Sequence, residues 1–169
     1  LYGFVDQKGK MVIPPQYPSA RDFKLGLAPA KADNRFGLID RKGNWIVPPR
    51  YEQVWYAGDE RWGIRQNGQY GAIDAEGQVV IPPQYDQLYP FREGLSHYME
   101  GNLWGIISRS GEVITSPKFG LAWSFSEGLA RAATYYGIAF VDHSGAIAIA
   151  PDFRDVRDFS EGRARVQEY

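Results

Sequence analysis

The sequence contains no cysteine, which excludes disulfides, thiolate nucleophiles and cysteine-held zinc or iron–sulfur sites. It also lacks an excess of either charge, because 19 lysines and arginines face 20 aspartates and glutamates, and this argues against nucleic acid as the main partner. No apolar run reaches the roughly 20 residues that a membrane-spanning helix needs. What remains is rich in glycine, proline and aromatic residues, a composition that favours many short strands separated by turns.

A repeat of 34 residues runs through the whole chain. Its first turn is marked by Gly9, Gly43, Gly77, Gly111 and Gly145, each 34 residues after the previous one. In the same phase lie Pro15, Pro49, Pro83, Pro117 and Pro151. We therefore predict one domain, residues 1-169, made of five repeats: 1-34, 35-68, 69-102, 103-136 and 137-169. Because the first residue is Leu1 and not a start methionine, we expect the chain to be a piece or a processed product of something longer.

Each repeat predicts a hairpin followed by a third strand. In repeat 2, the apolar segment 37–39 and the segment 45–47 flank a turn that begins with Asp40, and the proline pair that follows is expected to stop the second strand. The next segment carries apolar residues at every third position, which predicts a helical turn or an irregular link. The third strand ends in a tight-turn pair such as Asp33-Asn34, so it is expected to fold back antiparallel onto the first strand of the next repeat.

One repeat has too few apolar residues to bury a core alone, so neighbouring repeats are expected to share one. The predicted fold is all-β, an open solenoid-like array of five three-stranded meanders, with a closed, small propeller-like ring as the alternative. Aromatic residues that recur in phase are expected to form the shared core: Tyr17, Tyr51, Tyr85, Phe119 and Phe153, together with Phe23, Phe91, Phe125 and Phe159.

These residues carry a family resemblance. The repeat resembles the bacterial WG repeat, W-G-x-I-D-x-x-G-x-x-V-I-P-P-x-Y followed by F-x-E-G-L-A. Trp104-Gly105 keeps the signature dipeptide, Tyr2-Gly3, Phe36-Gly37 and Tyr70-Gly71 place another aromatic before the glycine, and Ile138-Ala139 departs from it. The resemblance covers essentially all 169 residues. It implies a module of bacterial proteins, often surface-associated or attached to other domains, with no family-wide catalytic residues.

No catalytic or metal-binding constellation is found in the sequence. His97 and His143 lie at different phases of the repeat, so its symmetry does not bring them together. The aspartates that open the hairpin turns could be read as a calcium ladder, but they lack the dense oxygen spacing of calcium loops and are better explained as turn formers. No serine lies in a Gly-x-Ser-x-Gly context. We therefore expect no enzyme activity, no cofactor and no metal site.

One column of the repeat is a candidate binding surface. Counting by 34, its members are Arg21, Trp55, Tyr89, Trp123 and Arg157. A position that varies between arginine and tryptophan is hard to bury uniformly, so we predict a row of exposed rings flanked by guanidinium groups. The alternative is that these rings pack edgewise between repeats. Trp62 is a separate departure, in a column of small residues, and is expected to fill the space that Ala57 leaves where other repeats place phenylalanine.

Charge differs between the repeats. Repeats 1 and 2 each carry two more basic than acidic residues, whereas repeat 3 has one basic residue and five acidic ones. A partner could recognise this difference in net charge between repeats, although solvent-exposed surfaces without a function show similar differences.

The leading hypothesis is a non-enzymatic repeat scaffold that binds another protein. The alternatives are a carbohydrate or cell-wall binding module and a structural or regulatory spacer attached to another domain. The expected partner is a protein or, in the alternative, a polysaccharide, with no nucleic acid and no membrane span. The bacterial cell envelope or secretion is slightly favoured over the cytoplasm, on the resemblance alone.

Overall fold

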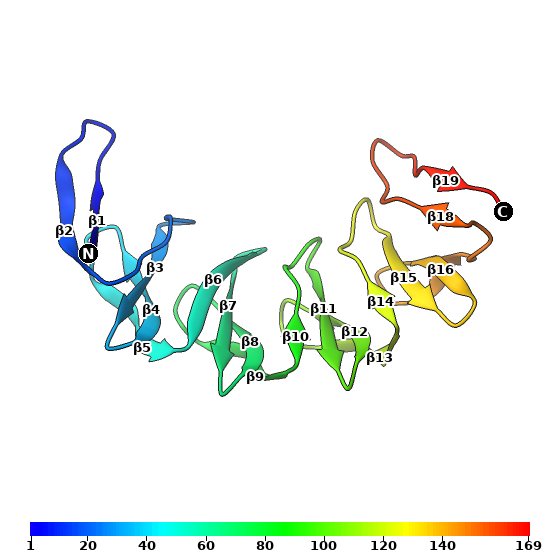
Figure 1. Ribbon diagram of the computed structural model, residues 1–169, viewed down its shortest axis with the longest axis horizontal. Coiled ribbons are helices and arrows are strands. Elements are labelled where there is room, and N and C mark those ends of the chain that lie inside the picture. The colour runs from blue at the N-terminus through cyan, green and yellow to red at the C-terminus, as the bar shows by residue number, and fades with distance from the viewer. The chain divides into compact units, whose positions relative to one another are not determined.

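The computed structural model describes all 169 residues and contains strands but no helix (Figure 1). Four types of strand recur. The first strands of the hairpins are β1 (Tyr2–Val5), β4 (Arg35–Asp40), β8 (Gln69–Ile73), β12 (Leu103–Ser108) and β16 (Gly137–Val141). The second strands are β2 (Met11–Tyr17), β5 (Trp45–Tyr51), β9 (Val79–Tyr85), β13 (Val113–Phe119) and β17 (Ile147–Ile149). The third strands are β3 (Leu27–Ala32), β7 (Arg61–Gln66), β11 (Leu95–Glu100), β15 (Ala130–Thr134) and β19 (Val166–Gln167). A fourth type comprises β6 (Gln53–Gly58), β10 (Gln87–Leu88), β14 (Leu121–Ala122) and β18 (Asp155–Val156).

The strands form six small antiparallel sheets. Their orders are β1-β2, β3-β4-β5, β6-β7-β8-β9, β10-β11-β12-β13, β14-β15-β16-β17 and β18-β19. The all-β array of tandem repeats is therefore confirmed. No sheet closes into a barrel, and the first and last strands pair only within their own two-stranded sheets, so the closed ring has no support.

The chain divides into two compact units. The first unit comprises Leu1–Tyr56 and Glu60–Gln84, and the second comprises Ala57–Asp59 and Tyr85–Tyr169.

Each of the larger sheets combines two successive repeats. In the sheet β10-β11-β12-β13, the first two strands come from repeat 3 and the last two from repeat 4. The pairing of β11 with β12 runs without a break from Leu95 opposite Ser108 to Glu100 opposite Leu103. The predicted fold-back of the third strand onto the next repeat is thus confirmed, and it connects neighbouring repeats through backbone hydrogen bonds.

The link after the prolines was expected to be a helical turn or irregular; it is not helical, and in repeats 2 to 5 part of it forms a strand. The link carries the short fourth strands β6, β10, β14 and β18, each at the edge of its sheet beside a third strand. Backbone bonding explains the difference: the amide of Tyr89 donates to the carbonyl of His97 at 2.9 Å, and the amide of Asp86 donates to that of Met99 at 3.0 Å. The three-residue spacing reflects an irregular strand of which only some side chains enter the core.

The proline pair was expected to end the second strand, and this is wrong. β2 runs through Pro14 and Pro15 to Tyr17. Opposite it, Tyr2 pairs with Tyr17 but Phe4 pairs with Ile13, so the second strand has two extra residues in a bulge. Prolines are tolerated there because a bulge on an outer strand needs no amide donors.

This bulge explains the glycine of the aromatic–glycine dipeptide. At Gly71, a Cβ atom would collide with the carbonyl oxygen of Ile81 and would lie 2.7 Å from the nitrogen of Pro83. Gly3, Gly37 and Gly105 face the same carbonyl of their own hairpins. The backbone of the bulge therefore occupies the space that any side chain would need.

The aspartates of the hairpin turns accept backbone hydrogen bonds, as predicted. The Asp74 carboxylate accepts from the amides of Glu76 at 3.0 Å and Gln78 at 2.8 Å. The same pair of bonds is made by Asp6, Asp40 and Asp142. A hydrogen bond from the Asn44 side chain lowers the pKa of Asp40 below its ordinary value.

Neighbouring repeats share their cores, as expected. In the first unit, Ile13 and Tyr17 of repeat 1 pack in one cluster with Ile39 of repeat 2. Val5 occupies the position of Ile39 one repeat earlier and is 57% exposed, whereas Ile39 is 0% exposed. The difference shows that this column is buried by the preceding repeat and not by its own. The core aromatics are buried at Tyr17, Tyr51, Tyr85, Phe91, Phe119 and Phe125, and half-buried at Phe23, Phe153 and Phe159.

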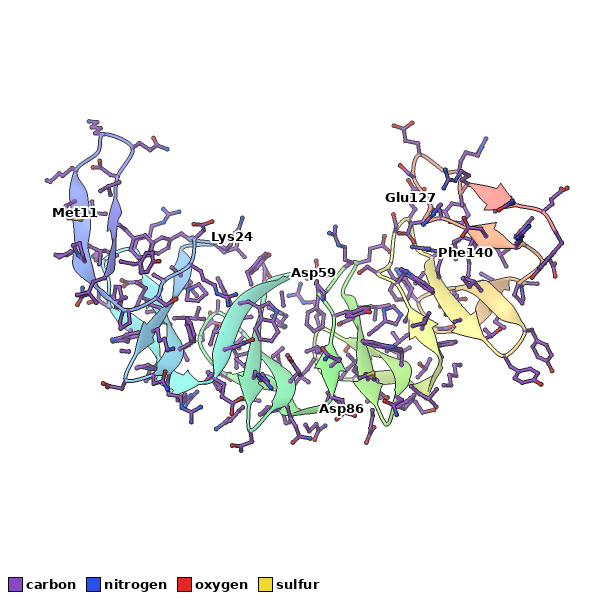
Figure 2. The ribbon with its side chains drawn as sticks, in the orientation of Figure 1. Met11, Lys24, Asp59, Asp86, Glu127 and Phe140 are labelled. Atoms are coloured by element: carbon purple, nitrogen blue, oxygen red, sulfur yellow. The ribbon has the colours of Figure 1, made fainter.

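In the second unit, a series of carboxylates also connects successive repeats. Asp59 accepts a hydrogen bond from the amide of Gly94 at 2.7 Å. Glu93 and Glu127 do the same for Gly128 at 3.0 Å and Gly162 at 2.9 Å. Figure 2 labels two of these acids, Asp59 and Glu127. Each bond joins a turn to the equivalent turn of the next repeat.

Gly71→Ala should destabilise the protein more than Gly43→Ala. Gly43 has a φ of 87° and only ordinary contacts, the nearest being 3.4 Å to Ile13, so its substitution should cost about 1–2 kcal/mol of backbone strain. Gly71 has no such φ, but its Cβ would meet backbone that must move, and the expected loss is roughly 3 kcal/mol. Urea unfolding of both variants measures the two free energies. Equal losses would show that the bulge yields easily.

Candidate functional site

The five residues of the predicted column lie on the fourth strands or directly after them. Trp55 is on β6, and Tyr89, Trp123 and Arg157 directly follow β10, β14 and β18. Arg21 has the same place in repeat 1, which has no fourth strand. The amides of the column's members donate to the carbonyl eight residues later, at 2.9 Å from Arg21 to Pro29, 3.1 Å from Trp123 to Arg131 and 2.9 Å from Arg157 to Arg165. We call these five residues, Arg21, Trp55, Tyr89, Trp123 and Arg157, the edge column. The two arginines are exposed and the three aromatic residues are half-buried. The predicted row of exposed rings is therefore corrected to a row of partly covered rings.

Partial covering comes from the next repeat. Trp55 meets Tyr70 edge-on, with ring centroids 5.9 Å apart and planes at 71°. Tyr89 lies 4.3 Å from Trp104 with planes at 38°. The Arg21 guanidinium lies 5.8 Å from the centroid of Phe36. In three repeats, then, the edge-column residue packs against the aromatic residue of the next aromatic–glycine dipeptide.

In repeat 4 the edge-column residue, Trp123, has a different neighbour, because Ile138 replaces that aromatic residue. The Arg131 guanidinium lies 4.5 Å from the Trp123 ring centroid. Its Nε donates to Asp158 at 2.6 Å, and Nη1 donates to the carbonyl of Val156 at 3.2 Å. Sequence reasoning missed Arg131, although a charge in the column of Pro29, Gly63 and His97 was a signal that could have been used.

The first unit contains a cleft of about 230 Å³ that includes two edge-column residues. Its lining residues are Arg21, Asp22, Lys24, Pro29, Trp55, Tyr56 and Trp62. Figure 2 labels Lys24, in the turn that leads into β3. The other three edge-column residues belong to the second unit and do not line this cleft. The sequence had not identified Asp22, Lys24, Pro29 or Tyr56 as site residues.

Two tryptophans shape this cleft. Trp55 lies directly on the backbone of Gly63, because a Cβ atom there would collide with its ring. Trp62 is completely buried, as its predicted space-filling role requires, and it meets Tyr56 edge-on at 5.3 Å. Its indole Nε1 has no hydrogen-bond partner. The cleft therefore combines flat apolar surface with two cations, Arg21 and Lys24.

The second unit has a cleft of about 250 Å³ that is lined by different chemistry: Arg92, Ser124, Phe125, Ser126 and Asp158. Arg92 and Ser124 occupy the repeat positions of Lys24 and Tyr56. This cleft contains no tryptophan, so its lining differs in chemistry from that of the first cleft.

The two histidines lie closer together than repeat symmetry suggested. His97 stacks on Phe125 at 5.4 Å, and His143 meets the same ring edge-on at 5.1 Å. His143 Nε2 lies 2.7 Å from a carboxylate oxygen of Glu93. Neither ring nitrogen of His97 has a hydrogen-bond partner, and its burial lowers the pKa to about 4. His97 is therefore a neutral ring of the core at neutral pH.

No group of three or more histidine, aspartate or glutamate residues in the chain is arranged to hold a metal ion. No helix is present that is long and apolar enough to cross a membrane.

Lowering the pH should weaken the fold through His97. Its folded-state pKa of about 4 lies below the ordinary 6.5, so the unfolded state takes up the proton first and stability falls as pH decreases from about 6.5 to about 4. Between pH 7 and 4.5 this group should remove on the order of 2 kcal/mol. The measurement is the unfolding free energy of the wild type minus that of His97→Leu at both pH values. A pH-independent difference would contradict the buried, neutral state.

The sequence matches the family described as WG containing repeat over residues 2–35, 36–69, 70–104, 104–133 and 139–169. No curated protein matches the chain. Among solved structures, BamB from Moraxella catarrhalis is similar with 14% sequence identity and a TM-score of 0.45. That match covers 95% of this chain but 58% of the BamB chain, so the chain spans less than two thirds of its length. Because five successive matches cover nearly all residues, the chain belongs to the WG containing repeat family.

Proposed function

We propose that the chain is a non-enzymatic repeat scaffold that binds another protein through the edge column. The observation that carries the proposal is the half-burial of Trp55, Tyr89 and Trp123 on edge strands or beside them. One part of each ring is fixed by a neighbour, so the ring loses little conformational freedom when a partner covers the rest. Tryptophan, tyrosine and arginine are also the residues that dominate binding energy at protein interfaces.

Repetition supports the same function. A surface that offers one contact residue per repeat suits an extended partner, because several modest contacts add up when they are made by one chain. Edge strands also carry backbone groups that a partner strand can pair with.

The test replaces the three aromatic residues by the residue found at the ends of the column. In Trp55→Arg/Tyr89→Arg/Trp123→Arg, arginine should be tolerated at the first two positions, because Tyr70 and Trp104 lie there as Phe36 lies beside Arg21. At position 123 the new arginine faces Arg131, which stays paired with Asp158. We expect the wild type to capture one bacterial protein from a lysate and envelope fraction, and the variant to lose more than tenfold of that capture. Thermal unfolding verifies that the variant is folded.

The matched control is Gln53→Ala/Gln87→Ala/Leu121→Ala, which changes exposed residues of β6, β10 and β14, two positions before each aromatic residue. It should keep the partner. Equal capture by the edge-column variant would refute this binding surface. Retention of the wild type by cell-wall polysaccharide alone would favour the carbohydrate module, and capture of nothing would favour a spacer.

A further inference from the structure

We propose that the cleft of the first unit binds an extended acidic segment of the partner, with a carboxylate on Arg21 and Lys24 and an apolar side chain against Trp55. This inference rests on the proposed function and adds the chemistry of the partner. It concerns only the seven residues that line the cleft.

The charges favour an anionic ligand. The cleft contains two cations, Arg21 and Lys24, against one carboxylate, Asp22. No ion pair within the chain involves Arg21 or Lys24. Arg21 is nevertheless positioned, because its guanidinium lies 5.8 Å from the Phe36 ring. A guanidinium with free donors in a fixed place is suited to bind a carboxylate.

Tyr56 gives the cleft a fixed apolar wall. It lines the cleft and packs edge-on against the completely buried Trp62, with ring centroids 5.3 Å apart. An apolar side chain of the ligand therefore meets a ring that is already held in place by its neighbour.

Size and position favour a peptide over a small molecule or a sugar chain. About 230 Å³ is less than drug-sized ligands need but accommodates one or two side chains. Trp55 and Tyr56 lie on β6, which has six residues, whereas β10, β14 and β18 have two each. The longest of the fourth strands thus adjoins the cleft, and an extended peptide can pair with such an edge while its side chains enter the cleft.

The experiment selects a phage-displayed library of random dodecapeptides on the whole chain. We expect the recovered peptides to be enriched in aspartate and glutamate next to aromatic, proline or aliphatic residues. Synthetic copies should bind at least tenfold more weakly to Arg21→Glu/Lys24→Glu. Lys8→Glu/Lys10→Glu is the control, because it changes the net charge equally in the same unit but outside the cleft. Peptides without acidic enrichment, or equal losses in both variants, would overturn the proposal.

Gly63→Ala tests the role of Trp55 without removing any charge. Its Cβ would displace the Trp55 ring, so peptide affinity should fall several-fold while the thermal unfolding of the variant shows that it remains folded. Unchanged affinity would exclude Trp55 from the site. Binding of polygalacturonate in place of the acidic peptides would overturn the peptide proposal and assign the cleft to an acidic sugar.

Failure here is distinguishable from failure of the proposed function. Tyr89→Arg/Trp123→Arg lies in the second unit and leaves the cleft unchanged. If this variant loses the lysate partner while Lys24→Glu keeps both that partner and the selected peptides, the scaffold stands and the cleft proposal fails.

Discussion

The close approach of two backbone segments inside each hairpin is the constraint on which the rest of the structure depends. The bulge of the second strand places a carbonyl oxygen against the glycine of the aromatic–glycine dipeptide, at Gly3, Gly37, Gly71 and Gly105. Because the bulge absorbs two residues, the aromatic residue before the glycine faces the aromatic residue after the prolines, as Trp104 faces Phe119. The fifth repeat supports this relation. It has Ala139 and Ala150 in place of the glycine and the first proline, and its second strand ends early, at Ile149.

The hairpin geometry is transmitted between repeats through the turns. A Cβ atom at the turn glycine Gly77 would lie 2.7 Å from Val47 of the preceding repeat. The turn therefore lies directly on β5, the second strand of that repeat. A second connection, from acid to turn amide, is confined to the second unit. In the first unit Leu25 occupies the acidic position and cannot accept such a bond. Two kinds of contact therefore stabilise the array, and only the first depends on apolar burial.

Much of the fold could be predicted because its determinants recur every 34 residues. The hairpins, the Asp74 type of turn and the return of the third strand onto the next repeat each have a local signature, and all are confirmed. The bulge and the edge strands were mispredicted, since proline and a three-residue spacing ordinarily indicate a break in a strand. Only the pairing of β1 with β2 reveals that the prolines lie in a bulge, where no backbone amide is needed as a donor. The cleft was only half predictable, because Tyr56 and Trp62 of repeat 2 come to Arg21 and Lys24 of repeat 1 through the packing of two repeats and not through phase.

The edge column differs from the buried columns in what limits its composition. A column such as Leu38, Ala72, Ile106 and Phe140 is 0–2% exposed and is restricted to apolar residues that fit between sheets. An edge-column residue is covered on one side and open on the other, and arginine, tyrosine and tryptophan all occur there on the same backbone. Substitution there changes surface chemistry at little cost to folding. A repeat protein built in this way can vary its surface chemistry from one repeat to the next. The cleft of the first unit is lined by tryptophan and that of the second by serine, which is such a difference.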